Sequence, residues 1–201
     1  QRWKAMSKLV LTEFLEFRTD SDLLTEAERK AVQEGEEIYL AGVMQRAGAT
    51  NGNGRIYPKQ ILEREVENYQ KLVREGRAVG ELDHPDSSVV ELKNASHLVT
   101  EIKMDGDDVV GKIRILDTPA GQTAIGLLKG GVKLGISSRG LGSTRNEAGK
   151  TIVQDDFQLV CFDLVSEPST TGAFMLREGK EPNIFTKADK INRLLNDLVK
   201  E

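Results

Sequence analysis

The chain has 201 residues, of which 38% are apolar and 30% charged, and its formal net charge is −4. This length can bury one full hydrophobic core and the composition is that of a globular protein, so we expect a single domain. No apolar run approaches the roughly 20 residues that span a bilayer. Basic residues are scattered and aromatic residues are few, so the sequence also argues against a nucleic-acid partner.

A single cysteine, Cys161, excludes an internal disulfide, and with two histidines it is too little for a structural zinc site. We therefore expect no metal or other cofactor, and a reducing compartment. Met6 opens "MSKLVLTEF" in the manner of a natural start, which indicates that residues 1–5 are upstream sequence. No charged segment followed by an apolar one marks a signal peptide.

The first predicted element is an acid-rich segment at 18–37, which we interpret as a peripheral arm with some helical spacing. Strand composition follows at 38–44, and the glycines and asparagines of 45–57 predict a mobile surface loop. A helix is predicted from Pro58, because proline suits the first helical position and apolar residues then recur at helical spacing until Gly76.

A short strand is predicted at 78–82, where the following "DHPDSS" ends the pairing. Two further strands at 96–104 and 109–116 are joined by "DGDD", which favours a tight hairpin. Thr118 and Pro119 predict the start of a second helix, which closes at the glycine pair after residue 129.

Residues 133–167 are predicted as a strand, a turn around "NEAGK" and one long strand, "TIVQDDFQLVCFDLVSE". An apolar stripe predicts a helix over 191–199. The fold class that results is α+β, with a small, mostly antiparallel β-barrel flanked by helices. We divide the chain into an arm at 1–35, a main domain at 36–180 and a helical tail at 181–201.

The stretch "LGISSRGLGS" at 134–143 gathers glycines and serines around one arginine. A phosphate-binding loop is a poor interpretation, because the spacing of G-x-x-x-x-G-K-[ST] is absent and no helix follows. It is not the G-x-S-x-G turn of α/β-hydrolases either, since Arg139 stands where the second glycine belongs.

Strand alternation separates the two serines of this stretch. If Leu134 and Ile136 face the core, Ser138 shares their side, whereas Ser137 and Arg139 point to the other face. Ser137 is therefore the better candidate nucleophile. The backbone N–H groups of Ser138, Arg139 and Gly140 could then face an oxyanion.

The two histidines differ in their setting. His84 stands where a strand ends against Pro85, which would leave its imidazole at the rim of the sheet, although a solvated surface histidine is the plain alternative. In "SHLVTEIKM" the alternation places Leu98 and Ile102 on one face and His97 on the other, so His97 is predicted to be solvated.

Asp163 is an acid in the apolar strand "FQLVCFDLV". Alternation from Phe157 places Leu159, Cys161, Asp163 and Val165 on one face. A buried carboxylate must be paired or neutral, so one interpretation is a neutral acid or an ion pair with an arginine. The other is an acid that orients a histidine, as in a nucleophile, base and orienter.

Four motifs, "NGNGRIYPKQILEREV", "GELDHP", "GISSRGLGS" and "FDLVSEPS", occur in this order over about residues 36–170. Together they resemble the prohead maturation proteases of tailed phages, of the T-even type. The resemblance implies the fold of herpesvirus assemblins, a β-barrel ringed by helices. It also implies a serine endopeptidase with 36–180 as protease domain and 1–35 as propeptide.

On this chain the family's histidine corresponds to His84 and its serine to Ser137. Asp163 occupies the place of the third member, with Glu167 close by. The arginines near the herpesvirus oxyanion site have no clear match in "SEPSTTG", so Arg139 and the neighbouring amides are the candidates. His84 would take the proton of Ser137 as it attacks the scissile carbonyl, and Asp163 would orient the imidazole.

The resemblance further implies cleavage after glutamate in [Leu/Ile]-x-Glu, with scaffold core and major capsid proteins as substrates. It places the enzyme inside the prohead in the host bacterial cytoplasm and implies a homo-oligomer. We hypothesise that residues 8–17 occupy the cleft and are cut between Glu13 and Phe14. Arg55, Lys59 and Arg139 are candidates, by charge alone, for the group that recognises glutamate.

Two other classes of function remain. A non-catalytic scaffold or tube-like assembly protein could share the barrel and would not need His84, Ser137 and Asp163 together. A serine hydrolase of small esters fits less well, because the sequence indicates no aromatic-lined pocket.

Overall fold

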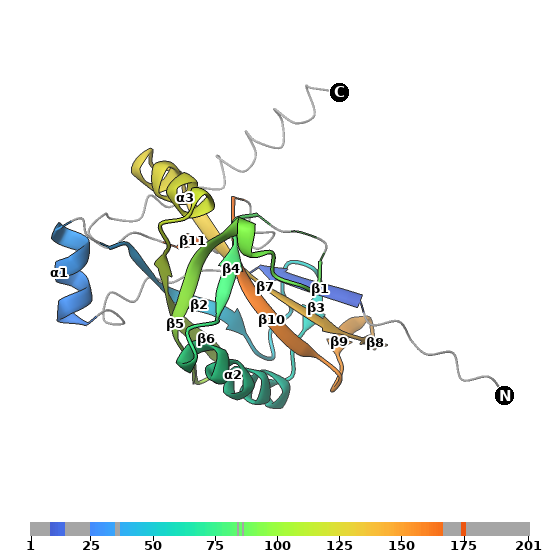
Figure 1. The fold of residues 1–201 in the computed structure, drawn as a ribbon. Helices are drawn as coiled ribbons and strands as arrows, with labels where there is room; N and C mark the ends of the chain where they lie inside the picture. Colours follow the sequence, from blue (N-terminus) through green and yellow to red (C-terminus); the bar gives the residue numbers. More distant parts are fainter. Residues whose placement is uncertain are drawn as a thin grey trace, which may run out of the picture.

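The structure is a computed structural model that describes residues 9–14, 25–34, 37–83, 85, 87–166 and 174–175. Over these residues the fold is mixed α+β and dominated by antiparallel strands, as predicted (Figure 1). The described strands form three sheets, and their pairing closes no barrel, so the barrel of the sequence prediction is not found. The predicted helix at 191–199 lies outside the described residues.

The first sheet carries the serine-rich stretch. Its order is β1-β7-β10, with β1 at Leu9–Phe14, β7 at Leu134–Gly142 and β10 at Gln158–Val165. The two-residue strand β11, Phe174–Met175, also pairs with β7, opposite its first residues. The strand β7 therefore lies between β10 on one edge and β1 with β11 on the other.

The second sheet has the order β2-β6-β5-β4. These strands span Tyr39–Arg46, Asp108–Ile115, Ala95–Asp105 and Val79–Glu81 respectively. The predicted hairpin between β5 and β6 is confirmed, and Gly106 takes a left-handed φ of 61° in its turn.

The first two sheets meet where β4 ends. Leu82 forms a parallel bridge with Leu164 of β10, and the Asp83 N–H donates to the Leu164 carbonyl over 2.8 Å. The chain that leaves β4 toward His84 is thus fastened beside the serine-bearing sheet.

A third, small sheet has the order β3-β9-β8, with β3 at Arg55–Ile56, β8 at Thr144–Glu147 and β9 at Lys150–Val153. The predicted single strand from 151 to 167 is therefore wrong, because β9 and β10 belong to different sheets. Between them the Phe157 N–H donates to the Gln154 carbonyl and closes a turn that contains two aspartates.

Local signals placed two of the helices well. Helix α2 spans Lys59–Arg74 directly after Pro58, and it packs on β5 and β10. Helix α3 spans Pro119–Lys129, where Thr118 Oγ1 accepts from the Gly121 N–H as the predicted cap. In Figure 1 these helices lie at opposite ends of the strands.

Helix α1, Glu26–Glu34, lies in the segment predicted as a peripheral arm. Its first turn is a capping box, in which Thr25 Oγ1 accepts from the Glu28 N–H and a Glu28 carboxylate oxygen accepts from the Thr25 N–H. A 3₁₀ turn, η2 at Leu92–Asn94, precedes β5.

The hydrophobic core lies between α2, α3 and the two larger sheets. From α2 it receives Leu62, Val66 and Tyr69, and the Tyr69 ring meets Phe162 of β10 edge to face at 5.6 Å. One face of the serine-bearing sheet is therefore turned to the core.

Candidate active site

Ser137 and Ser138 are neighbours on β7 that point to opposite faces of the sheet. Across the β7–β10 ladder Ser137 lies opposite Asp163, and Ser138 lies opposite Phe162. Directly opposed residues share a face, so Ser137 and Asp163 share one face while Ser138 and Phe162 share the core face. The predicted alternation of the two serines therefore matches the register. Both serines are buried.

Asp163 forms a buried ion pair with Arg139. The Arg139 Nη2 group donates to Asp163 Oδ1 over 3.1 Å, and Nε lies 3.0 Å from Oδ2. Neither side chain is exposed to solvent. The ion pair with an arginine, one of the two interpretations of this acid, is thus present in the structure.

Glu81, at the end of β4, is the second carboxylate on the same guanidinium. Arg139 Nη2 donates to Glu81 Oε2 over 2.6 Å, and the Glu81 N–H donates to Asp163 Oδ1 over 3.1 Å. Burial opposes the charge of Arg139, but the neighbouring acidic groups outweigh it and raise its pKa further above the usual value. We call Arg139, Glu81 and Asp163 the arginine cluster.

Sequence reasoning missed Glu81, although it stands within the motif "GELDHP". The same signal that singled out Asp163 could have found Glu81, because it too is an acid in an otherwise apolar strand, the short β4. Its partner could not be named from the sequence, because Arg139 lies on a strand far along the chain.

His84 lies outside the described residues, as does Glu167. The residue before His84 is described: Asp83 has a left-handed φ of 67° and is tied to the Leu164 carbonyl. Leu164 follows Asp163, the residue opposite Ser137. Asp83, the residue before His84, is therefore held next to Asp163 in the structure.

His97 is buried, contrary to the prediction that it is solvated. Its Nε2 group donates to the Phe162 carbonyl over 2.7 Å, and Nδ1 accepts from Ser96 Oγ over 2.8 Å. Burial lowers the pKa of His97 to about 4. A neutral imidazole held in this way joins the two larger sheets.

The error has a structural cause, a bulge in β5. The pairing with β6 shifts between Val99 and Glu101, so that His97, Val99 and Ile102 all face the core. Simple alternation along β5 placed His97 on the wrong face, because it does not include the register of the neighbouring strand β6.

A similar bulge lies in β10 between Leu159 and Cys161. Leu159 lies opposite Gly140 and so shares the core face, whereas Cys161 lies opposite Arg139 and shares the face of Asp163. The predicted common face of Leu159, Cys161 and Asp163 is therefore wrong. Burial, aided by the nearby Asp163, raises the pKa of the Cys161 thiol well above its usual value.

The strand β1 lies against the edge of β7 opposite to β10. In its register Glu13 is opposite Ser138, and Phe14 is opposite Ser137. Leu11 is opposite Gly140 and is 1% exposed, within the core cluster. The segment hypothesised to occupy the cleft thus pairs directly with the serine-bearing strand.

Of the oxyanion candidates, Ser138, Arg139 and Gly140 all lie within the ladders to β1 and β10. Their N–H groups alternate between the two neighbouring strands. Of the candidates for recognising glutamate, Arg139 is committed to its buried partners, and Lys59 pairs with Asp107 at 3.0 Å. Arg55 lies on β3 in the third sheet.

Within the described part of the chain, no three His, Cys, Asp or Glu side chains are arranged to hold a metal ion. None of the described helices has the length and hydropathy needed to cross a bilayer.

Comparison with known proteins shows what the chain is similar to. A family model described as prohead core protein serine protease matches residues 13–183. The prohead core protein protease of Enterobacteria phage T4 is 33% identical over 173 residues, which is 82% of this chain and 82% of that protein. The solved capsid assembly protease of bacteriophage T4 superposes with a TM-score of 0.66 at 27% identity, covering 80% of this chain and 99% of that chain.

Proposed function

Because the chain belongs to the family of prohead core protein serine proteases, we propose that it is a serine endopeptidase that cleaves scaffold core and major capsid proteins as a phage prohead matures. The observation that carries the catalytic part is the shared face of β7 and β10. Ser137 and Asp163 lie opposite each other on that face. The chain that leads to His84 is fastened next to them at Leu164.

In the proposed mechanism Ser137 Oγ attacks the scissile carbonyl while His84 accepts its proton as general base. His84 then returns the proton to the leaving amine, and water completes hydrolysis of the acyl-enzyme by the same path. Asp163 orients the imidazole and stabilises its charged form. The Arg139 contacts support this role, because they hold the carboxylate in one orientation.

We further propose that β1 is an internal substrate, cut between Glu13 and Phe14. The register supports this, because the two residues that flank this bond lie opposite Ser138 and Ser137. Buried Ser137 would become accessible once β1 leaves.

A substrate strand would then take the place of β1 along the edge of β7. Departure of β1 would free every second N–H group of β7 on that edge, some for the substrate backbone and one for the oxyanion. The buried seat of Leu11 opposite Gly140 would accept the Leu or Ile of the proposed [Leu/Ile]-x-Glu motif. The enzyme would act as a homo-oligomer inside the prohead.

The test is cleavage by the full chain, alone and with a scaffold-derived peptide that contains Leu-x-Glu. Mass spectrometry should find a new N-terminus at Phe14 and cleavage of the peptide after glutamate. Ser137→Ala should abolish both, by roughly 10⁴-fold or more in rate. Ser138→Ala, the matched control on the neighbouring residue, should retain most of the activity if it folds.

Three results would overturn parts of this proposal. Activity that survives in Ser137→Ala but is lost in folded Ser138→Ala would transfer the nucleophile to Ser138. An active enzyme with no new terminus at Phe14 would exclude the internal cleavage. A folded chain that cleaves no scaffold or capsid protein would favour the non-catalytic assembly function.

A further inference from the structure

Arg139 contacts the two carboxylates and also the segment 83–94, which contains His84 and precedes β5. We call this segment the His84 loop. The Arg139 Nη1 group donates to the Ser87 carbonyl over 2.7 Å and lies 3.4 Å from the Val89 carbonyl. Its Nη2 group donates to Glu81, which precedes His84 in the sequence, whereas Ser87 and Val89 follow it. One guanidinium therefore binds the chain on both sides of His84.

The part of this loop that Arg139 binds, at Ser87 and Val89, lies over the face of β7 to which Ser137 points. Arg139 and Ser137 are two residues apart on one strand and so share a face. The loop carbonyl that Arg139 binds must lie over that same face. The fully buried state of Arg139 agrees with such a cover.

Among the described residues of the loop no apolar side chain is fully buried, and Pro85 and Val90 are only partly buried. Val89 is 66% exposed and Leu92 is 75% exposed. The described contacts within the loop are polar and local, such as the Val89 N–H to Ser87 Oγ bond of 3.2 Å. A segment with so little buried apolar surface depends on individual hydrogen bonds for its position.

Only arginine can make this set of contacts. The guanidinium holds its N–H donors in one rigid plane, and here its two Nη groups donate to two carboxylates and to the loop carbonyls at once. A lysine ammonium would keep the charge but, as a compact group on a flexible stem, would not span these partners.

We propose that Arg139 is a positioning residue that holds the His84 loop against the serine-bearing strand and so sets the distance between base and nucleophile. This role deepens the proposed function and rests on it, because His84 is the base only in that mechanism. The hold on the loop itself is a property of the fold and can be measured without activity.

The experiment compares the full chain with its Arg139→Lys and Arg145→Lys variants. Arg145 is the matched control, since it lies just beyond β7 on β8 with its side chain 62% exposed. Hydrogen exchange of the amides at 87–94 should become about tenfold faster in Arg139→Lys, while exchange in β5 stays unchanged. With the Leu-x-Glu peptide, kcat should fall roughly 100-fold and KM should change less than about threefold, because the substrate edge of β7 is intact.

A second variant covers the case in which Arg139→Lys does not fold. The double variant Arg139→Gln with Glu81→Gln removes one positive and one negative charge together, so the net charge of the cluster is preserved. It should show the same faster loop exchange and the same loss in kcat.

Unchanged loop exchange in a folded variant would overturn the proposal, as would an unchanged kcat or a loss confined to KM. A wild-type chain that lacks peptidase activity would instead refute the proposed function. The exchange measurement would still decide in that case whether Arg139 holds the loop.

Discussion

Arg139 and Lys112 are both buried cations that contact two carboxylates, but the carboxylates differ in their access to water. Around Arg139, the Glu81 and Asp163 side chains are no more than 1% exposed. Around Lys112, the Glu28 and Glu101 side chains are 21% and 45% exposed, at distances of 3.0 and 2.9 Å. We call Lys112, Glu28 and Glu101 the lysine cluster.

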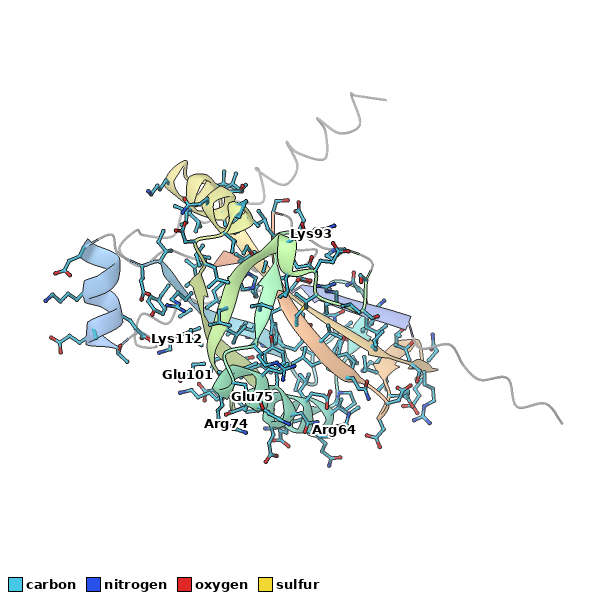
Figure 2. All side chains as sticks on the ribbon, viewed as in Figure 1. Arg64, Arg74, Glu75, Lys93, Glu101 and Lys112 are labelled. Carbon is cyan, nitrogen blue, oxygen red and sulfur yellow. The ribbon has the colours of Figure 1, made fainter. Side chains whose placement is uncertain are left out.

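The two clusters also join different parts of the molecule. The arginine cluster ties the His84 loop to the serine-bearing sheet. The lysine cluster ties helix α1 to the outer face of the second sheet, where Figure 2 labels Lys112 beside Glu101. Water screens the lysine cluster, so equal charge counts should give unequal energies.

Matched substitutions of the two cations should show the largest difference. Arg139→Met leaves two buried carboxylates without their counter-ion, so the free energy of unfolding should fall by about 3–5 kcal/mol. Lys112→Met leaves carboxylates that water can solvate, and the loss should be less than about 1 kcal/mol. Urea denaturation of both variants and the wild type measures these values.

Equal losses from the two substitutions would break the comparison. Circular dichroism of each variant in the absence of urea serves as the control, because both must start from the native fold. An m-value that differs from the wild type would indicate a changed denatured state instead of a lost interaction.

The pH dependence of stability should separate the two regions further. His97 is buried and binds the carbonyl of Phe162, the residue before Asp163 of the arginine cluster. Between pH 6.5 and about 4 the unfolded chain binds a proton at His97 that the folded chain does not. The contribution of His97 to the free energy of unfolding is therefore fully present above pH 6.5. It falls by up to about 3 kcal/mol as the pH drops to 4. Urea denaturation at half-unit pH steps measures the slope.

The control is His97→Gln, which should remove most of the slope in this interval. The stabilisation by Glu28 in the lysine cluster should be lost only below this interval. Burial opposes ionisation of Glu28, but the Thr25 N–H and Lys112 outweigh it and lower the pKa of Glu28 below 4.5. A slope between pH 6.5 and 4.5 that persists in His97→Gln would assign the effect to other groups.

Elements with local signals could be predicted from the sequence. The proline before α2, the Thr118 cap of α3 and the Asp105-Gly106 turn each act within a few residues, and each was placed correctly. Ser137 and Ser138 could be assigned to opposite faces because the strand β7 itself has no bulge.

Features that depend on a partner strand could not be predicted. The bulges of β5 and β10 reversed the inferred faces of His97 and Leu159, since a bulge is defined by the register of the neighbouring strand. The partners of Arg139 come from β4 and from the loop after it. Such contacts join segments far apart in sequence, and alternation within a single strand carries no information about them.

A substitution at Gly80 measures how tightly the residues around His97 and Phe162 are packed. A Cβ atom at Gly80 would lie 1.9 Å from the Phe162 carbonyl oxygen and 2.3 Å from His97 Nε2. Gly80→Ala should therefore lower the free energy of unfolding by about 1–3 kcal/mol, because backbone or imidazole must move. Thermal unfolding followed by circular dichroism measures the change.

Gly126 is the matched control, since a Cβ there meets no atom within 4 Å. It lies inside helix α3, where alanine is favoured over glycine, so Gly126→Ala should stabilise by about 0.5–1 kcal/mol. Equal tolerance of alanine at both positions would contradict close packing around His97.

The smallest effect is expected at Glu28, which joins the lysine cluster to helix α1. Glu28→Gln removes one charge from Lys112 but keeps the carbonyl oxygen that the Thr25 N–H needs, so the capping box of α1 survives. The global free energy of unfolding should change by less than about 1 kcal/mol, and the difference should vanish in about 1 M salt.

Hydrogen exchange in Glu28→Gln should become faster in α1 alone, because only this helix loses a contact with the sheet. Glu26→Gln, an exposed residue of the same turn, should leave that exchange unchanged. A global loss as large as that of Arg139→Met would mean that access to water does not distinguish the two clusters.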